Sequence, residues 1–380
     1  LSLGANTLAV NGNLANVGTI TATTGLLQFD GGTAAAYSGT GTNTLYDVVV
    51  NKTAVTLSCT ATLTVSRSFT VQSSGRFLAT AGSVTFAGGT AGTIVNTSTG
   101  AAPQLTLFDV VLNKTADLSS TDNWSVAGEY TNTIGNLVCT AGTVTLIGSA
   151  NRGMALNGGT VQFNNLTINQ DTATTRTWTT GGSQMTLLGT LDNAGAGGFT
   201  ITPTWTNAGT TSNVIRNSGA GATTMSALIL NKSAAAASVT PEVTAGAMTV
   251  TGDLTNQGSQ TFGTTTGTFS VNGNLTQSGA AVLSSAGGTF RFGGASASTI
   301  TSTSTGGISF FHFTIDKSAA VNVSTTNSFT VLGTFTNSGA GSFVANQGIE
   351  TPWQTFQNGT LVINDGLDVT WGYRFTVLVN

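Results

Sequence analysis

The chain has 380 residues, and its composition excludes several classes of protein before any motif is considered. Charged residues make up only 7% of the chain, against about 25% in ordinary globular domains. The net charge of −3 argues against a basic surface for nucleic acid, and no apolar run is long enough to span a membrane. We therefore expect no nucleic-acid partner and no membrane-spanning segment.

One nine-residue phrase recurs along the whole chain. It reads apolar, small, apolar, any, Gly, any, apolar, small, Asn or Gln, as in Phe329–Asn337. This alternation with a central Gly predicts a strand, a bend and a second strand. In chain order the copies begin at Leu8, Leu63, Trp124, Met185, Met248, Phe269 and Phe329, and the Leu63 copy has Arg67 at the Gly position.

The spacing of the copies indicates stacked coils. The successive steps are 55, 61, 61, 63, 21 and 60 residues, and 21 is one third of 63. A second phrase, Val48–Thr53, returns with its Asn or Asp at steps of 62, 56, 62 and 85. The last step is longer by 23 residues and spans the copy at Phe269, so both phrases locate one inserted coil. The long repeat is predicted to be three coils of about 21 residues, giving roughly 18 coils in all.

Coils of this length with Gly and Asn corners predict an all-β fold, a parallel β-solenoid, over residues 1–346. Like positions of successive coils stack about 4.8 Å apart, so apolar positions become internal ladders. The main alternative, a string of immunoglobulin-like sandwiches, would lack the 21-residue offset. One inward ladder is predicted to contain Val48, Val110, Leu166, Leu228 and Phe313. A second is predicted to contain Val50, Leu112, Ile168, Leu230 and Ile315, with Val49, Val111, Thr167, Ile229 and Thr314 facing outward between them.

The segments Phe163–Asn169 and Met248–Asn256 resemble the repeats of large secreted bacterial β-solenoid surface proteins, of the adhesin and autotransporter-passenger type. The resemblance covers roughly residues 1 to 345. It implies an extracellular location at the cell surface and a non-enzymatic role. It names no ligand and transfers no functional residues.

Residues that could carry chemistry are scarce. The single His, His312, lies in a predicted strand between aromatic residues, which favours a structural role over catalysis. Asp109, Asp117 and Asp122, near Lys114, are the best group of acids for a carbohydrate-active site, but solvated turn residues are the simpler interpretation. We expect no catalytic residue, no metal site and no cofactor.

The four lysines, Lys52, Lys114, Lys232 and Lys317, occupy one position of the repeat. The favoured interpretation is an exposed column beside the Asn corner, and the alternative is an Asn–Lys isopeptide crosslink. Cys59 and Cys139 are 80 residues apart. Because nearly four coils separate them, we expect two buried thiols that do not pair.

The tail, residues 347–380, breaks the repeat and is predicted to be a cap or an assembly segment. A solenoid end exposes unpaired backbone, so it must be covered or joined to another chain. The candidate assembly residues are Trp371, Tyr373, Phe375, Val377 and Val379.

Two functions of different classes follow from these observations. The first is a structural subunit of an extracellular fibre, a head-to-tail homopolymer in which an adhesive role toward cell-surface glycans is compatible with the repeats. The second is a carbohydrate-active or glycan-binding β-helix protein. Exposed Trp178 and Trp205 could stack on sugars, although isolated aromatic residues more often cover gaps at the corners of a solenoid. The low charge and the single His favour the first function.

Overall fold

The computed structural model describes residues 1–180, 185–327, 329–345, 349–350, 353–356, 361–363 and 375–377. The chain divides into two compact units, residues 1–186 and 187–380. Each unit is a parallel β-solenoid, and together they contain about 14 coils of about 23 residues. All described elements are strands, and the described residues include no helix of the length and apolar character that crosses a membrane. The predicted fold class is therefore confirmed.

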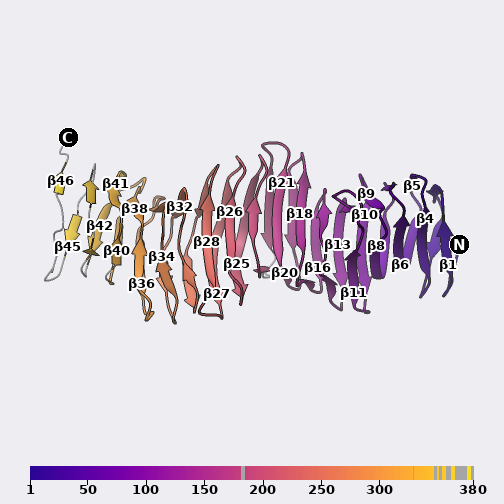
Figure 1. Ribbon diagram of the computed structural model, residues 1–380, viewed down its shortest axis with the longest axis horizontal. Helices are drawn as coiled ribbons and strands as arrows, with labels where there is room; N and C mark the ends of the chain where they lie inside the picture. Colours follow the sequence, from indigo (N-terminus) through magenta and orange to yellow (C-terminus); the bar gives the residue numbers. More distant parts are fainter. Residues whose placement is uncertain are drawn as a thin grey trace. The chain divides into compact units, whose positions relative to one another are not determined.

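Each coil of unit 1 has three strand segments, and equivalent segments pair in parallel to form three faces; β4, β6 and β8 lie side by side in Figure 1. Face 1 contains β1 (Thr7–Val10), β4 (Leu26–Gly31), the second halves of β6 (Thr42–Lys52) and β8 (Leu63–Val71), β11 (Gly92–Asn96), β14 (Leu118–Ser120), β17 (Leu137–Cys139) and β20 (Val161–Phe163). Face 2 contains β2 (Leu14–Ala15), β5 (Ala35–Ser38), β7 (Thr56–Cys59), β9 (Arg76–Ala79), β12 (Leu105–Leu107), β15 (Trp124–Val126), β18 (Thr143–Gly148) and β21 (Asn165–Gln170). Face 3 contains β3 (Thr19–Thr21), the first halves of β6 and β8, β10 (Ser83–Gly88), β13 (Asp109–Lys114), β16 (Tyr130–Ile134), β19 (Arg152–Leu156) and β22 (Thr175–Thr180).

Unit 2 has the same three-sided coil, and β23 (Met185–Leu187) lies at the boundary between the units. Its face 2 contains β24 (Leu191–Asn193), β26 (Asn213–Asn217), β28 (Ser238–Val243), β31 (Thr261–Phe262), β34 (Val282–Ser284), β37 (Ile308–Phe310), β40 (Phe329–Val331) and β43 (Ile349–Glu350). Its face 3 contains the first halves of β25 (Gly198–Gly209) and β27 (Thr223–Lys232), β29 (Met248–Val250), β32 (Thr268–Val271), β35 (Thr289–Phe292), β38 (His312–Ile315), β41 (Thr334–Asn337), β44 (Trp353–Phe356) and β46 (Phe375–Val377). Its face 1 contains the second halves of β25 and β27, β30 (Leu254–Gly258), β33 (Leu275–Gln277), β36 (Ser298–Ser302), β39 (Asn322–Thr325), β42 (Ser342–Ala345) and β45 (Leu361–Ile363).

The coil length corrects the predicted relation between coil and repeat. With about 23 residues per coil, a long repeat is eight strand segments, or two and two-thirds coils, rather than three coils. Successive copies of the phrase therefore lie on different faces of unit 1: the Leu8 copy begins on face 1, the Leu63 copy on face 3 and the Trp124 copy on face 2. The copies at Met248 and Phe269 are one coil apart, and these two residues pair directly on face 3 of unit 2.

The residues of the two predicted ladders are buried, as predicted, but they do not form two continuous ladders. Because successive copies lie on different faces, Val48 pairs with Phe69 on face 1, whereas Val110 pairs with Val84 on face 3. Leu166 pairs with Val144 on face 2.

Leu166 and Ile168 in β21 are 0% exposed, whereas Thr167 between them is partly exposed. Alternation of this kind places every second side chain in the core, which is where apolar burial stabilises a narrow coil. Cys59 and Cys139 are separate buried thiols, as predicted. Trp178 and Trp205 are completely buried, so neither can stack on a sugar.

Aromatic contacts reinforce the core of unit 2. The rings of Phe290 and Phe310 are 5.0 Å apart, and those of Phe313 and Phe335 are 5.1 Å apart, all in tilted arrangements. Such pairs add about 0.5–1.5 kcal/mol to the free energy gained from burial alone. The interior of each coil is thus filled by side chains.

Candidate functional site

The four lysines are buried, and the prediction of an exposed column was wrong. Each lysine is 0% exposed. Their ammonium groups donate to backbone carbonyls of the two preceding coils rather than pointing to solvent. Lys52 Nζ donates to Asn11 O at 2.9 Å and Asp30 O at 2.5 Å, and Lys114 Nζ donates to Ser66 O at 2.6 Å and Ala87 O at 3.0 Å.

The same arrangement recurs in unit 2. Lys232 Nζ donates to Leu188 O at 2.8 Å and Ala208 O at 2.6 Å. Lys317 Nζ donates to Asn272 O at 3.1 Å, Gly293 O at 2.5 Å and Ser298 Oγ at 2.6 Å. Each ammonium ties three consecutive coils together at a corner, and we call this arrangement the cation corner. Because successive repeats shift by one face, Lys52 and Lys114 close corners on faces 1 and 3 of unit 1 rather than forming one column.

The second phrase, first seen at Val48–Thr53, departs from its usual pattern in its third copy, Leu166–Asp171, which has Gln170 in place of the lysine. Gln170 Oε1 accepts from Thr174 Oγ1 at 2.8 Å, and its Nε2 has no hydrogen-bond partner within the described part of the chain. Arg176, at the start of β22, supplies the cation instead. Its Nη1 donates to Gly128 O and its Nη2 to Ile147 O, both at 2.8 Å.

Burial changes the proton affinity of these cations. It lowers the pKa of Lys232 and of Lys317 to about 8, because the charged form is removed from water. Burial, with nearby Arg152, also lowers the pKa of Arg176 to about 10. Arg176 nevertheless keeps its charge at neutral pH, because this pKa lies well above 7.

Acidic and amide side chains cap the turns between coils. Asp109 Oδ1 accepts from the backbone N–H of Glu129 at 2.7 Å, and Asp47, at the same position of the repeat, accepts from that of Ser68 at 3.1 Å. Asp117 accepts from Asn136, and Asp122 accepts from the backbone N–H of Asn96, both at 2.9 Å. The structure therefore engages the three predicted acids separately and does not join them to Lys114.

The remaining sequence candidates also have structural partners or lie outside the described residues. His312 Nδ1 accepts from the backbone N–H of Thr334 at 3.0 Å. Among the described residues, no group of three or more His, Cys, Asp or Glu side chains could hold a metal ion. Of the candidate assembly residues, Phe375 and Val377 belong to β46, which pairs with β44, and Trp371, Tyr373 and Val379 lie outside the described residues.

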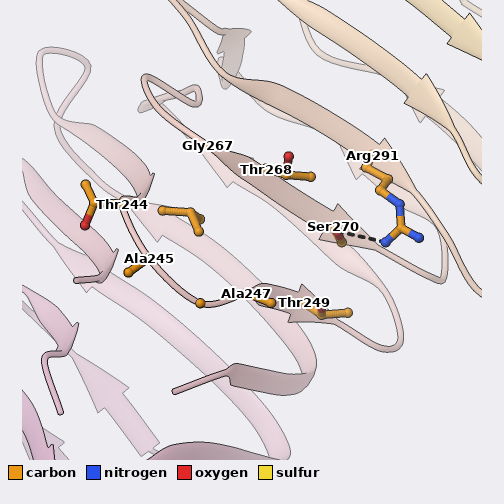
Figure 2. A pocket seen from close by; sticks show the side chains of 10 residues that line it. Thr244, Ala245, Ala247, Thr249, Gly267, Thr268, Ser270 and Arg291 are labelled. Atoms are coloured by element: carbon orange, nitrogen blue, oxygen red, sulfur yellow. Dashed lines mark hydrogen bonds between the residues drawn. The ribbon is translucent and has the colours of Figure 1, made fainter. Parts of the chain in front are cut away.

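A surface hollow of about 420 Å³ on unit 2 was not predicted from the sequence. It lies between the turn formed by residues 244–247 and the outer surface of face 3, and Figure 2 shows Arg291 at one end of it. Threonine and serine hydroxyls and small apolar side chains line the rest. The inserted coil that begins at Met248 is the feature of the sequence that could have indicated this hollow, because the hollow lies beside that coil.

The inward residues of the first coil of unit 1 are the other notable surface. Leu8, Val10 and Leu14 are only half-buried, although pairing aligns Leu8 with Leu27, which is fully buried.

No protein-family model matches the chain, and neither the curated proteins nor the solved structures compared with it include a match.

Proposed function

We propose that the chain is a non-enzymatic structural subunit of an extracellular fibre, in which copies associate end to end. The stacking of the coils, in which equivalent strands pair in parallel from one coil to the next, is the observation that supports the proposal. A stack of coils suits this role because each added coil extends the same core.

The first coil offers both apolar surface and free backbone groups. Pairing aligns Leu8 with Leu27 and Leu14 with Tyr37, and the second member of each pair is buried while the first is half-exposed. Within the described residues, β1 pairs only with β4 and β2 only with β5. Another coil laid on this edge would bury the apolar side chains and extend both faces.

Devices that normally block such an edge are absent from this part of the chain. Natural edge strands are protected by charged residues, proline or bulges. Neither a charged side chain nor a proline occurs before Asp30 in the printed sequence. The edge of β1 is therefore suited to pairing with another strand.

We assign the complementary edge to the tail, residues 347–380. Its last described strand, β46, pairs through one edge with β44 and carries Phe375 and Val377. A contact between unlike ends of two copies is heterologous and propagates into a filament. Charge repulsion would oppose it weakly, because the net charge is only −3.

Two neighbouring residues of β1 give a matched test. Val10 points inward and is half-buried, whereas Ala9 is exposed on the outer surface. We expect Val10→Lys to abolish filaments in electron micrographs and to shift light scattering to a single subunit. Ala9→Lys, with the same added charge, should leave assembly intact.

Removal of residues 366–380 tests the other end, and should also stop assembly while the remaining solenoid still unfolds cooperatively. A wild-type protein that stays monomeric at all concentrations would contradict the proposal. Equal loss of assembly in Ala9→Lys and Val10→Lys would show that the effect is general charge repulsion rather than this edge.

A further inference from the structure

The hollow on unit 2 coincides with the interruption of the repeat. The inserted coil runs from Met248 to the residue before Phe269. The hollow is lined by the turn that leads into this coil, by Thr249 within it, and by Gly267, Thr268 and Ser270 around its end. Insertions in repeat proteins commonly map to one face, which is often the binding face. At about 420 Å³ the hollow falls within the range of about 300–1,000 Å³ typical of small-molecule sites.

The outward column of face 3 changes its chemistry at the same place. Its members are paired from coil to coil and have short hydroxyl side chains, with one exception, Arg291. In order they are Thr200, Thr224, Thr249, Ser270, Arg291, Thr314 and Thr336. Arg291, the only charged residue among these seven, lines the hollow together with Thr249 and Ser270.

Neighbouring side chains orient the guanidinium of Arg291. Its Nε donates to Asp316 Oδ2 at 2.9 Å, and its Nη2 also donates to that oxygen. Nη1 donates to Ser270 Oγ at 3.3 Å, the interaction drawn in Figure 2. About a third of the side chain, 35%, remains exposed. Asp316 thus holds one edge of the group, and Nη1 lies on the side of the hollow.

The rest of the lining complements a hydroxylated ring. Thr244, Thr249 and Thr268 supply hydroxyl groups that both donate and accept hydrogen bonds. Ala245 and Ala247 form a small apolar wall on the projecting turn. An arginine binds carboxylate or sulfate oxygens through charge-assisted hydrogen bonds.

We infer that this hollow binds an acidic saccharide, with its carboxylate or sulfate group on Arg291 and its ring hydroxyls on the threonines. The inference gives a ligand class to the adhesive role of the proposed surface fibre, and rests on that proposal only for its biological setting. Binding itself depends on unit 2 alone.

The test uses the full chain and three tetrasaccharides of defined chemistry: a tetragalacturonate, a sulfated tetrasaccharide and the neutral maltotetraose. Calorimetric titration should give binding of at least one acidic probe and at least tenfold weaker binding of maltotetraose. The acidic probe that binds identifies carboxylate or sulfate as the recognised group. Arg291→Gln should weaken binding at least tenfold. Thr268→Glu places a negative charge at an exposed lining position and should have a similar effect.

Arg67→Gln is the matched control. Arg67 also pairs with an aspartate one coil away, Asp47, but it belongs to unit 1 and does not line the hollow. It should bind the acidic probe as the wild type does. Circular dichroism establishes that all three variants are folded. Absence of binding by both acidic probes, equal binding of the neutral probe, or equal weakening in Arg67→Gln would overturn the inference.

Assembly, measured by light scattering on the same samples, separates this inference from the proposed function. If filaments form but no saccharide binds, the proposed fibre is supported and the proposed binding site is rejected. If a strictly monomeric protein binds the saccharide, the binding site is supported and the proposed fibre is rejected.

Discussion

Two corners of unit 1 use different residues to donate hydrogen bonds from a cation to backbone carbonyls. At the first, Lys114 extends from the end of β13 and donates to Ser66 O and Ala87 O. At the second, the repeat has Gln170, and Arg176 from the next strand donates to Gly128 O and Ile147 O. The repeated feature is therefore a cation beside a pair of inward carbonyls, and the position that supplies it can change.

The physical requirement lies in the backbone. Buried backbone carbonyls need hydrogen-bond donors, and at these corners a side chain of a later coil donates to them. An unsatisfied buried carbonyl costs about 1–3 kcal/mol, and a charged donor gives a stronger bond than a neutral one. A single ammonium or guanidinium group reaches two coils at once, which a short neutral side chain cannot do.

Removal of the Arg176 cation should have the largest effect. Arg176→Met preserves much of the side-chain volume but leaves two buried carbonyls without a donor, so we expect a loss of about 4 kcal/mol in the free energy of unfolding. Urea denaturation measures it. Adding Gln170→Lys to this variant restores the usual donor and should recover at least half of the loss. If the second change recovers nothing, the two corners are not equivalent.

The apolar ladder in the same strand should be nearly as sensitive. Leu166→Asn buries an amide without a partner and leaves a space, and should cost about 3 kcal/mol. Thr167→Asn, on the outer surface, should change stability by less than about 0.5 kcal/mol. Thermal unfolding of both variants compares them, and equal shifts in Tm would mean that the two faces of β21 are not distinguished by burial.

A milder change at the Lys114 corner tests how much of the stabilisation comes from the positive charge of the donor. Lys114→Gln gives this corner the amide found at Gln170, without the guanidinium that donates to the carbonyls there, and keeps a neutral donor. We expect a loss of about 2 kcal/mol, because hydrogen bonds of charged groups exceed those of neutral ones by roughly this amount. The control is Asn113→Gln at the adjacent exposed residue, which should be almost silent. A full-sized loss in the control would place the effect in the turn rather than in the ammonium group.

The buried lysines of the unit 2 corners should also make the stability depend on pH. Lys232 and Lys317 have folded pKa values of about 8, below the ordinary value of 10.5, so between these limits the unfolded chain binds more protons. Stability should therefore rise with pH over this window, by at most about 1.4 kcal/mol per pH unit for each lysine.

Burial raises the pKa of Cys59 to about 11 and of Cys139 to about 12, which lowers stability as the pH rises above 9. The measurement is therefore made on a Cys59→Ala/Cys139→Ala background by denaturation between pH 7.5 and 10. The upward slope should disappear when Lys232→Met and Lys317→Met are added. A slope that persists without the two lysines would assign it to other groups.

The class of fold, the inward orientation of alternate side chains and the separation of the thiols could be predicted from the sequence, whereas the stacking of the phrase copies as continuous ladders was wrong. The features predicted correctly depend on local quantities: alternation along a strand places Leu166 inside and Thr167 outside whatever surrounds them. The inserted coil was also predictable, because two independent phrases shift together.

The coil length, the orientation of the lysines and the hollow could not be predicted from the sequence, because they depend on contacts between coils. Coil length depends on how many residues each corner uses, so the long repeat closes as two and two-thirds coils although its spacing suggested three. Lys114 follows an exposed Asn113, and nothing in the local pattern shows that its ammonium group donates to backbone carbonyls of two other coils. Trp178 is buried for the same kind of reason, because the coils that cover it are distant in the sequence. Burial, charge and hydrogen bonding at a corner are properties of three coils together, and no single coil contains them.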